Sequence, residues 1–305
     1  MSITSASLYS SLAADLAGSD ALITKLQQQI ASGTRLAQPS DDPVAAAQAV
    51  RLSSAQSAIS SFRAACTDAT RFLGVADSTL GSMNTALQRV AQLGTSAVNA
   101  TNDATSNSAI ASEIGSLRAQ LARLANADSG VAGQSLFGGF AATAVTNSGG
   151  TWSYVGDAGA VNRQLDSSTT MTINDYGSGT AGGADLFGFT AGAGNDVFSV
   201  LDQLATAVAA GNTAGINAAQ TSLAARTSTI LEARGVVGAQ EARITSTQTV
   251  LATVSNANAA QLSSLQDTDV AQAALQLSQA QTGYQAALSV AARVGSLPSL
   301  ADFLR

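Results

Sequence analysis

Residue types that usually carry enzyme chemistry are scarce in this 305-residue chain, which has no histidine and a single cysteine, Cys66. Without histidine, Ser-His-Asp and Cys-His catalysis and histidine-based metal sites are excluded. Cys66 stands in a row of apolar residues at seven-residue spacing, which favours a small buried core residue over a nucleophile. A lone cysteine forms no intramolecular disulfide, which fits either a reducing compartment or an exported chain that avoids disulfides.

Two pairs of closely spaced carboxylates, Asp41-Asp42 and Asp267-x-Asp269, are the remaining candidates for general acid-base chemistry or for a divalent cation site. Both pairs directly precede helical runs, where carboxylates accept hydrogen bonds from free amides and complement the helix dipole. Helix capping is therefore the preferred interpretation. We expect no catalytic residue, no cofactor and no metal site, and hence no enzyme.

A connector of Ser40, Asp41, Asp42 and Pro43 is expected to begin a long helix over about residues 43–100. Proline fits the first helical position because its missing N–H would be unpaired there, and Asp42 or Ser40 can cap the next amides. No further proline interrupts this helix, and its apolar residues recur every seven positions, as in a coiled coil. This row is Leu52, Ile59, Cys66, Leu73, Leu80 and Leu87.

The pattern changes between about residues 135 and 195, where glycine and threonine become frequent and the seven-residue rows stop. Trp152 and Tyr154 alternate as in a strand; they could bind a ligand, but packing within a small sheet is preferred. Helical spacing resumes at Val197 and continues after the Gly211-Asn212 break. The second row is Ile216, Leu223, Ile230, Val237, Ile244, Leu251 and Leu265.

The order of these patterns predicts the fold class. A third helical block near residues 110–124 is expected to fold back antiparallel, and helices flank the β-type region on both sides. The predicted fold is mainly α: a long antiparallel helical coiled-coil rod built from both chain ends, with a small inserted β-rich domain.

Both ends of the chain carry apolar rows that need a facing helix, in the same chain or on a neighbouring copy. From Val270 to Ala292 there is no charged residue, although a solvated helix surface normally carries charges. We therefore expect protein to cover these ends on several sides. The expected subunit-interface residues are Leu12, Leu16, Ile23, Leu26, Ile30, Val270, Leu277, Tyr284, Leu288 and Val294.

Charge and hydropathy exclude several partners. The net charge is −6 and Lys25 is the only lysine, which argues against binding to nucleic acid or to an anionic membrane surface. The uncharged C-terminal stretch is long enough to span a bilayer, but its five glutamines make insertion costly. No secretory signal pattern is visible near the N-terminus, so an extracellular location requires another export route.

Several motifs carry a family resemblance. Residues 30–35 (IASGTR) and 40–47 (SDDPVAAA) resemble the signature of the bacterial flagellin superfamily. The PVAAA continuation is closer to the hook–filament junction branch (hook-associated protein type 3) than to filament flagellin. Further matches occur in family order at residues 134–139 (QSLFGG), 154–157 (YVGD), 196–198 (DVF), 233–238 (ARGVVG) and 267–304.

The resemblance implies a structural subunit of the bacterial flagellum, forming the junction between hook and filament by helical self-assembly through its terminal coiled-coil segments. It implies export without a cleaved signal peptide through the flagellar type III apparatus, with the help of an export chaperone. The implied neighbours are further copies of the chain, a hook-associated protein and flagellin. A filament flagellin is the alternative, and an exported ligand-binding protein or enzyme is less favoured.

The combined patterns divide the chain into five expected segments. Residues 1–40 and 266–305 are the N- and C-terminal assembly helices. Residues 41–134 and 196–265 are the two parts of the helical rod. Residues 135–195 form the β-rich insert.

Overall fold

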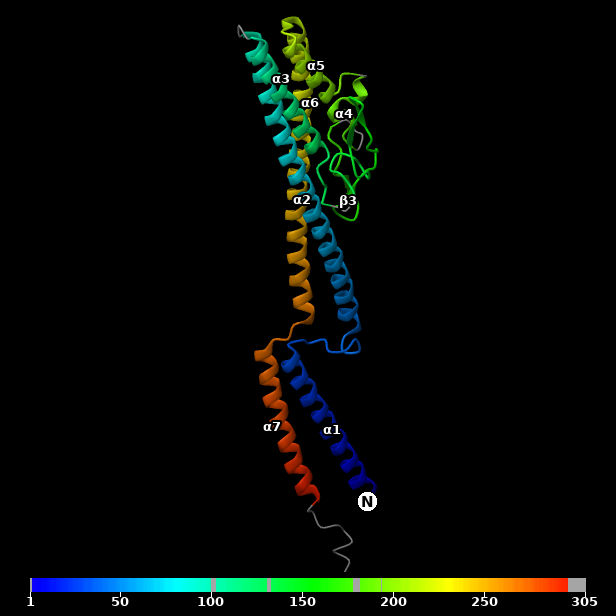
Figure 1. Cartoon of the computed structure of the whole chain (residues 1–305). Helices are drawn as coiled ribbons and strands as arrows, with labels where there is room; N and C mark the ends of the chain where they lie inside the picture. Colours follow the sequence, from blue (N-terminus) through cyan, green and yellow to red (C-terminus); the bar gives the residue numbers. More distant parts are fainter. Residues whose placement is uncertain (1, 100–102, 131–132, 178–181, 193, 296–305) are drawn as a thin grey trace, which may run out of the picture. The chain divides into compact units, whose positions relative to one another are not determined.

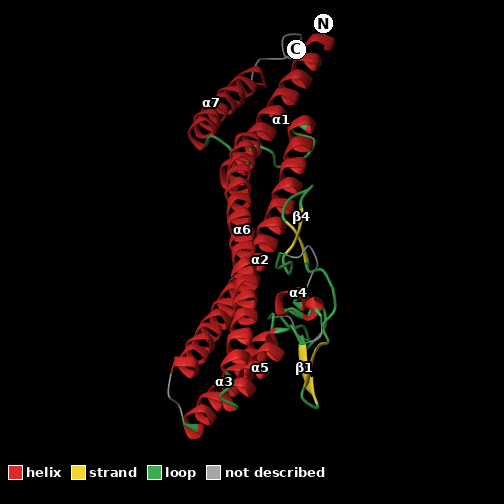
Figure 2. Ribbon diagram, turned by 90° about the horizontal axis from the view of Figure 1, so that it is seen from above, coloured by secondary structure: helices red, strands yellow, loops and turns green. Residues whose placement is uncertain are grey.

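The structure is a computed structural model that describes residues 2–99, 103–130, 133–177, 182–192 and 194–295. Helices dominate it, and the strands lie in the middle of the sequence (Figure 1, Figure 2). The helices are α1 (Ser2–Ser32), α2 (Pro43–Asn99), α3 (Ala104–Ala125), α4 (Ala184–Phe187), α5 (Val197–Ala209), α6 (Thr213–Gln266) and α7 (Val270–Gly295), with a 3-10 turn η1 (Phe189–Ala191). The strands are β1 (Val145–Ser148), β2 (Thr151–Tyr154), β3 (Asn162–Gln164) and β4 (Thr170–Thr172).

The chain divides into two compact units, each built from segments that are distant in sequence. The terminal unit comprises Met1–Ala58 and Thr253–Arg305, and the central unit comprises Ile59–Ala252. The long helices α2 and α6 contribute to both units. No helix in the described part of the chain combines the length and hydrophobicity that a membrane span requires.

The core of the central unit lies between α2 and α6, which run side by side (Figure 1). Arg234 of α6 pairs with Asp77 of α2 at 2.9 Å, whereas Gln220 lies against Gly94. Residue numbers thus rise along one helix as they fall along the other, so the pair is antiparallel. The predicted rows supply its buried side chains, among them Cys66, Leu73, Leu80, Leu87, Leu223, Ile230, Val237 and Ile244. The predicted mainly α, antiparallel coiled-coil fold is confirmed.

Two shorter helices, α3 and α5, pack against each other in the central unit. Asp103 caps α3 by accepting a hydrogen bond from the amide of Ser106, and Asp196 caps α5. Arg89 of α2 forms an ion pair with Glu113 of α3 at 2.8 Å. The packing of α3 on α5 widens the apolar core of the central unit. Strands β1 and β2 of the insert contact these two helices.

The insert contains two antiparallel hairpins rather than one continuous sheet. In the first, Val145 of β1 pairs with Tyr154 of β2, and Gly149-Gly150 form the turn with φ of +61° and +87°. Two successive residues at positive φ suit glycine and a tight hairpin turn. Sequence patterns predicted β2 but not β1, α4 or η1, because these short elements carry too few alternating or periodic apolar residues.

A polar and aromatic cluster holds the first hairpin against α3 and α5. The Trp152 ring stacks on Phe198 with centroids 4.7 Å apart, and its indole N–H donates to Asp202 at 3.0 Å. Arg118 pairs with Asp202 and lies over the indole ring at 5.6 Å. Trp152 thus packs against α3 and α5, and not within the small sheet where the sequence had predicted it, because its ring meets Phe198 and Arg118 and its N–H meets Asp202.

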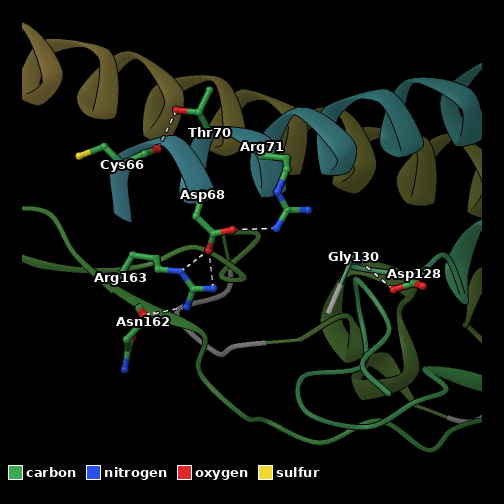
Figure 3. A network of polar contacts seen from close by, with 8 residues as sticks. All are labelled: Cys66, Asp68, Thr70, Arg71, Asp128, Gly130, Asn162 and Arg163. Atoms are coloured by element: carbon green, nitrogen blue, oxygen red, sulfur yellow. Dashed lines mark hydrogen bonds and ion pairs between the residues drawn. The ribbon is translucent and has the colours of Figure 1, made fainter. Parts of the chain in front are cut away.

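The second hairpin is tied to α2 by one carboxylate. Asp68 accepts hydrogen bonds from Arg71 on the same helix and from Arg163 of β3, each at 2.7 Å (Figure 3). These bonds, that of Arg71 above all, hold the pKa of the Asp68 carboxyl below its ordinary value. Arg71 also lies against the Gly130 turn, where a Cβ would approach its guanidinium to 2.5 Å.

Loss of the Asp68 carboxylate should make the free energy of unfolding vary less with pH in the acidic range. A depressed folded pKa stabilises the protein above the unfolded value of about 3.9, and this contribution disappears as the pH falls through the folded pKa. Asp68→Asn should therefore cost up to about 1 kcal/mol at pH 7, after allowance for solvent screening, and progressively less below about pH 4. Urea unfolding of both proteins from pH 7 to pH 2 measures this. Glu241→Gln, which removes a carboxylate without a cation partner among the described residues, is the control.

Burial of Cys66 generates a second expectation. The side chain is fully buried on α2, and desolvation raises the pKa of its thiol. Cys66→Asp places a carboxylate without a cation partner in the apolar core and should destabilise the central unit by roughly 3 kcal/mol or more. Ser60→Asp on the exposed side of α2 should change stability by at most about 0.5 kcal/mol. Equal losses in urea unfolding, or rapid reaction of native Cys66 with a thiol reagent, would contradict the buried placement.

Candidate assembly interface

The terminal unit brings the two ends of the chain together as a pair of helices, α1 and α7. On α1 the side chains with reduced exposure follow a coiled-coil spacing, and Leu26 is only 4% exposed. On α7 the corresponding residue is Ala273, also 4% exposed, with Leu277 and Tyr284 half-buried on the same side. The half-buried predicted residues on α1 are Leu12, Leu16, Ile23 and Ile30. The structure thus brings most of the predicted seam together within one chain.

Two of the predicted interface residues lie elsewhere on α7. Val270 is 49% exposed and Leu288 is 44% exposed, so neither is covered by α1. Because they stand eighteen positions apart, five helical turns, they share one side of α7 beside the face that packs on α1. The side chain of Val294 lies outside the described residues. Helix α7 therefore has an apolar side that its own chain leaves in solvent.

Exposed apolar side chains are concentrated in this unit. They are Leu22, Val44, Val50, Val254, Val270, Leu275, Leu288 and Val290. Few charges accompany them: α1 carries Asp15, Asp20 and Lys25, and α7 carries Arg293. An isolated soluble helix pair normally keeps its outer faces charged, so these faces are suited to contact with other protein.

A short structure that we name the clasp links the two chain ends beyond these helices; it consists of Gly33–Arg35 and Leu265–Thr268. Thr34 and Asp267 form an antiparallel bridge, in which the Arg35 amide donates to the Gln266 carbonyl at 2.6 Å. The Thr268 amide donates in turn to the Gly33 carbonyl at 2.9 Å. Gly33 has a φ of +69°, a conformation that ends α1 and turns the chain into the bridge.

Charged side chains brace the clasp. The Arg35 guanidinium donates to the Leu265 carbonyl at 2.9 Å and lies 3.8 Å from the Asp42 carboxylate. Lys25 of α1 pairs with Asp41 at 2.9 Å, and this bond lowers the pKa of the Asp41 carboxyl. The sequence motif IASGTR was recognised only as a family signature; the structure gives it a physical role. In the sequence, a glycine followed by two polar residues at the end of a helical pattern was the signal that could have predicted this helix end and turn.

One carboxylate of each pair caps a helix, whereas Asp41 pairs with Lys25 and Asp267 accepts a hydrogen bond from the Ser263 hydroxyl. Asp42 accepts a hydrogen bond from the Ala45 amide at the start of α2, and Asp269 accepts from Ala271 and Gln272 at the start of α7. Ser40 does not cap α2, because its hydroxyl donates to the Gln38 side chain instead. Within the described residues, no three acidic or cysteine side chains gather closely enough to hold a metal ion.

Comparison with known families agrees with this arrangement of paired chain ends. The model of the bacterial flagellin N-terminal helical region matches residues 3–142, and that of the C-terminal helical region matches residues 213–304. The chain belongs to the bacterial flagellin family. The N-terminal match contains α1 and α2, and the C-terminal match contains α6 and α7. Each helix pair described above, α1 with α7 and α2 with α6, therefore joins one helix from each matched region.

Individual relatives carry more specific names. The chain is 34% identical over 178 residues to flagellar hook-associated protein 3 of Salmonella typhimurium, covering 58% of this chain and 56% of that protein. It is 36% identical over 153 residues to flagellar hook-associated protein 3 of Escherichia coli, covering 50% and 48%. The chain thus spans about half the length of the relatives it matches.

Solved structures share the fold. A putative flagellar hook-associated protein from Vibrio parahaemolyticus superposes with a TM-score of 0.65 at 18% identity, covering 73% of this chain and 99% of that one. The flagellar junction protein FlgL from Legionella pneumophila superposes with a TM-score of 0.59 at 14% identity, covering 72% and 100%. At such low identities the likeness concerns the fold alone.

The clasp predicts opposite effects for two glycine substitutions. Gly33→Ala places a side chain at positive φ and should cost roughly 1–2 kcal/mol, loosening the bridge to Thr268. Gly18→Ala, in the middle of α1 with open space around it, should instead favour the helix by up to about 1 kcal/mol. Amide hydrogen exchange measures both, with faster exchange at Thr268 expected only for Gly33→Ala. Unchanged protection of Thr268 in that variant would contradict the proposed dependence on Gly33.

Proposed function

We propose that this chain is a structural subunit of the bacterial flagellum at the junction between hook and filament. We further propose that copies of the chain assemble helically through their terminal coiled-coil segments. The names of the relatives from two enteric bacteria support the junction role. The exposed apolar side chains of α1 and α7, which few charges accompany, support assembly, and this is the observation that carries the proposal.

The physical argument rests on the surface that stays uncovered after α1 and α7 have paired. Each helix presents one apolar face to the other, yet Val270, Leu275 and Leu288 remain about half exposed on α7. Burying such side chains against a neighbour contributes about 25 cal/mol per Å² of apolar surface. Glutamine, serine and alanine fill most of the remaining surface and can enter a protein contact without the desolvation cost of charges.

The proposed junction role also implies a location, an export route and a set of neighbours. The subunit would be extracellular, part of the flagellum, and exported without a cleaved signal peptide by the type III apparatus after binding an export chaperone. Its neighbours would be further copies of the chain, another hook-associated protein and flagellin, with no nucleic acid or membrane partner. The role is structural rather than enzymatic. The division into two assembly helices, a two-part rod and an insert stays a prediction.

The exposure of individual side chains decides which residues best test this proposal. Leu277 and Ile23 are half-buried between α1 and α7, so a charge there would disturb the chain's own helix pair as well as any subunit contact. Leu288 is exposed, so Leu288→Lys should leave the isolated subunit folded. At an assembled interface, the same lysine would be buried without a partner.

A deletion strain of the source bacterium provides the assay. Loss of the gene should leave hooks without filaments and release unpolymerised flagellin into the medium, and the wild-type gene should restore filaments. Leu288→Lys should restore at most about a tenth of the wild-type filament number, since burying an unpaired charge costs more than the roughly 1.4 kcal/mol that a tenfold change represents. Electron microscopy and flagellin blots of the medium give both readings.

A matched control is available on α6. Leu231 in the central unit is 47% exposed, close to the 44% of Leu288, so Leu231→Lys makes the same change at similar exposure. It should support filaments. Full rescue by Leu288→Lys, or by a chain that lacks residues 1–40 and 266–305, would contradict assembly through the ends. Thousands of copies along each filament, instead of a thin ring, would indicate a filament flagellin.

A further inference from the structure

The terminal unit contains a surface groove between the ends of α2 and α6. The groove measures about 380 Å³. Its lining residues are Gln48, Arg51, Leu52, Gln261, Ser264 and Leu265. The spacing of Val44, Gln48 and Arg51 places the exposed Val44 on the same side of α2 as this groove. The groove therefore combines apolar, amide and hydroxyl groups with a single charge.

Arg51 is the one charged residue among those that line the groove. Arg51 forms no ion pair with any described residue, and the neighbouring segment of α6, from Thr253 to Gln266, contains no charged residue at all. Arg35, Arg89 and Arg234 have carboxylate partners, whereas Arg63, Arg123, Arg226 and Arg243, like Arg51, form no ion pair among the described residues. Arg51 differs from those four because it lines the groove. An exposed guanidinium at the edge of a groove that also offers two leucines is suited to bind a carboxylate carried by an incoming helix.

A matching surface lies on α1. Asp15, Gly18 and Leu22 are spaced by three and four residues and share one side of the helix, beside the face that packs on α7. Leu22 is 49% exposed, and Asp15 is exposed without a cation partner among the described residues. Gly18 lowers helix stability relative to alanine, yet no described atom lies within 4 Å of the position its Cβ would occupy.

We propose that the groove of one subunit binds α1 of a second copy, with Asp15 of that copy pairing with Arg51. The charges are complementary, Leu22 supplies an apolar side chain for a groove lined by Leu52 and Leu265, and Gly18 permits close approach of the helix backbone. This inference rests on the proposed function, because it names the surfaces through which copies of the chain would assemble. It adds a specific intermolecular contact at the junction of α2 and α6 to the contacts made by α7.

Reversal of the two charges tests the pairing. Arg51→Glu and Asp15→Arg should each lower the number of filaments in the complemented deletion strain at least tenfold, because each places like charges opposite one another. The double variant restores an opposite pair at every contact between copies and should return the filament number to within twofold of wild type. Circular dichroism of the purified full-length variants should be unchanged, since neither residue has an ion-pair partner within the described chain.

Chemical crosslinking adds a direct reading of the contact. Cells producing Asp15→Cys chains together with Arg51→Cys chains should give a crosslinked dimer with a short bismaleimide, whereas either variant alone should not. The native Cys66 is buried, so its background reaction is small. Gly18→Leu offers a charge-independent check, because it fills the space that close approach requires and should lower filament number while the isolated helix remains folded.

The outcomes separate this pairing from the general proposal. Harmless charge reversals, combined with a defective Leu288→Lys variant, would overturn the pairing and leave assembly through the ends intact. Reversals that block filaments without rescue in the double variant would also overturn it, and would indicate that Arg51 binds a carboxylate of a different flagellar component. A deletion strain that still builds normal filaments would refute the proposed function and this inference together.

Discussion

The antiparallel pairing of α2 with α6 is the interaction on which the other contacts depend. It joins segments more than a hundred residues apart through rows of buried leucine, isoleucine and valine, and it encloses Cys66 within α2's row. In the terminal unit, Gln56 of α2 donates to the Ser255 hydroxyl of α6 at 2.6 Å. Because the two helices end close together there, Gly33–Arg35 can reach Leu265–Thr268 and form the clasp.

The many small side chains of this chain limit how much apolar surface its helices bury. Alanine, serine, threonine and glycine let helices approach closely but bury little apolar surface per residue. The central unit compensates with large buried residues such as Phe137, Phe187 and Phe198 between its helices and the insert. The terminal unit has no comparable aromatic cluster among its described residues, so its helices gain most from contact with further chains.

The β-rich insert is held by side chains rather than by sheet extension. Its hairpins are short, and hairpins of this size are marginal alone. Trp152 secures the first through Phe198 and Asp202, while Arg163 secures the second through Asp68. The insert is therefore bound to the helices at a few defined points, and substitutions at those points would act on its attachment without altering the α2–α6 core.

Local sequence patterns were enough to predict the long helices, the apolar rows and the family, because seven-residue spacing and short motifs are local properties of the chain. It predicted that Cys66 is buried and that Asp42 and Asp269 cap helices, and both predictions hold. Contacts between distant segments were needed to show that Leu277 and Tyr284 face α1 while Val270 and Leu288 remain in solvent. The same contacts show that Arg35 joins the two chain ends and that Arg51 has no ion-pair partner within the described chain. Periodicity shows that a residue lies on an apolar side of a helix, but which neighbour covers that side depends on contacts between segments far apart in sequence.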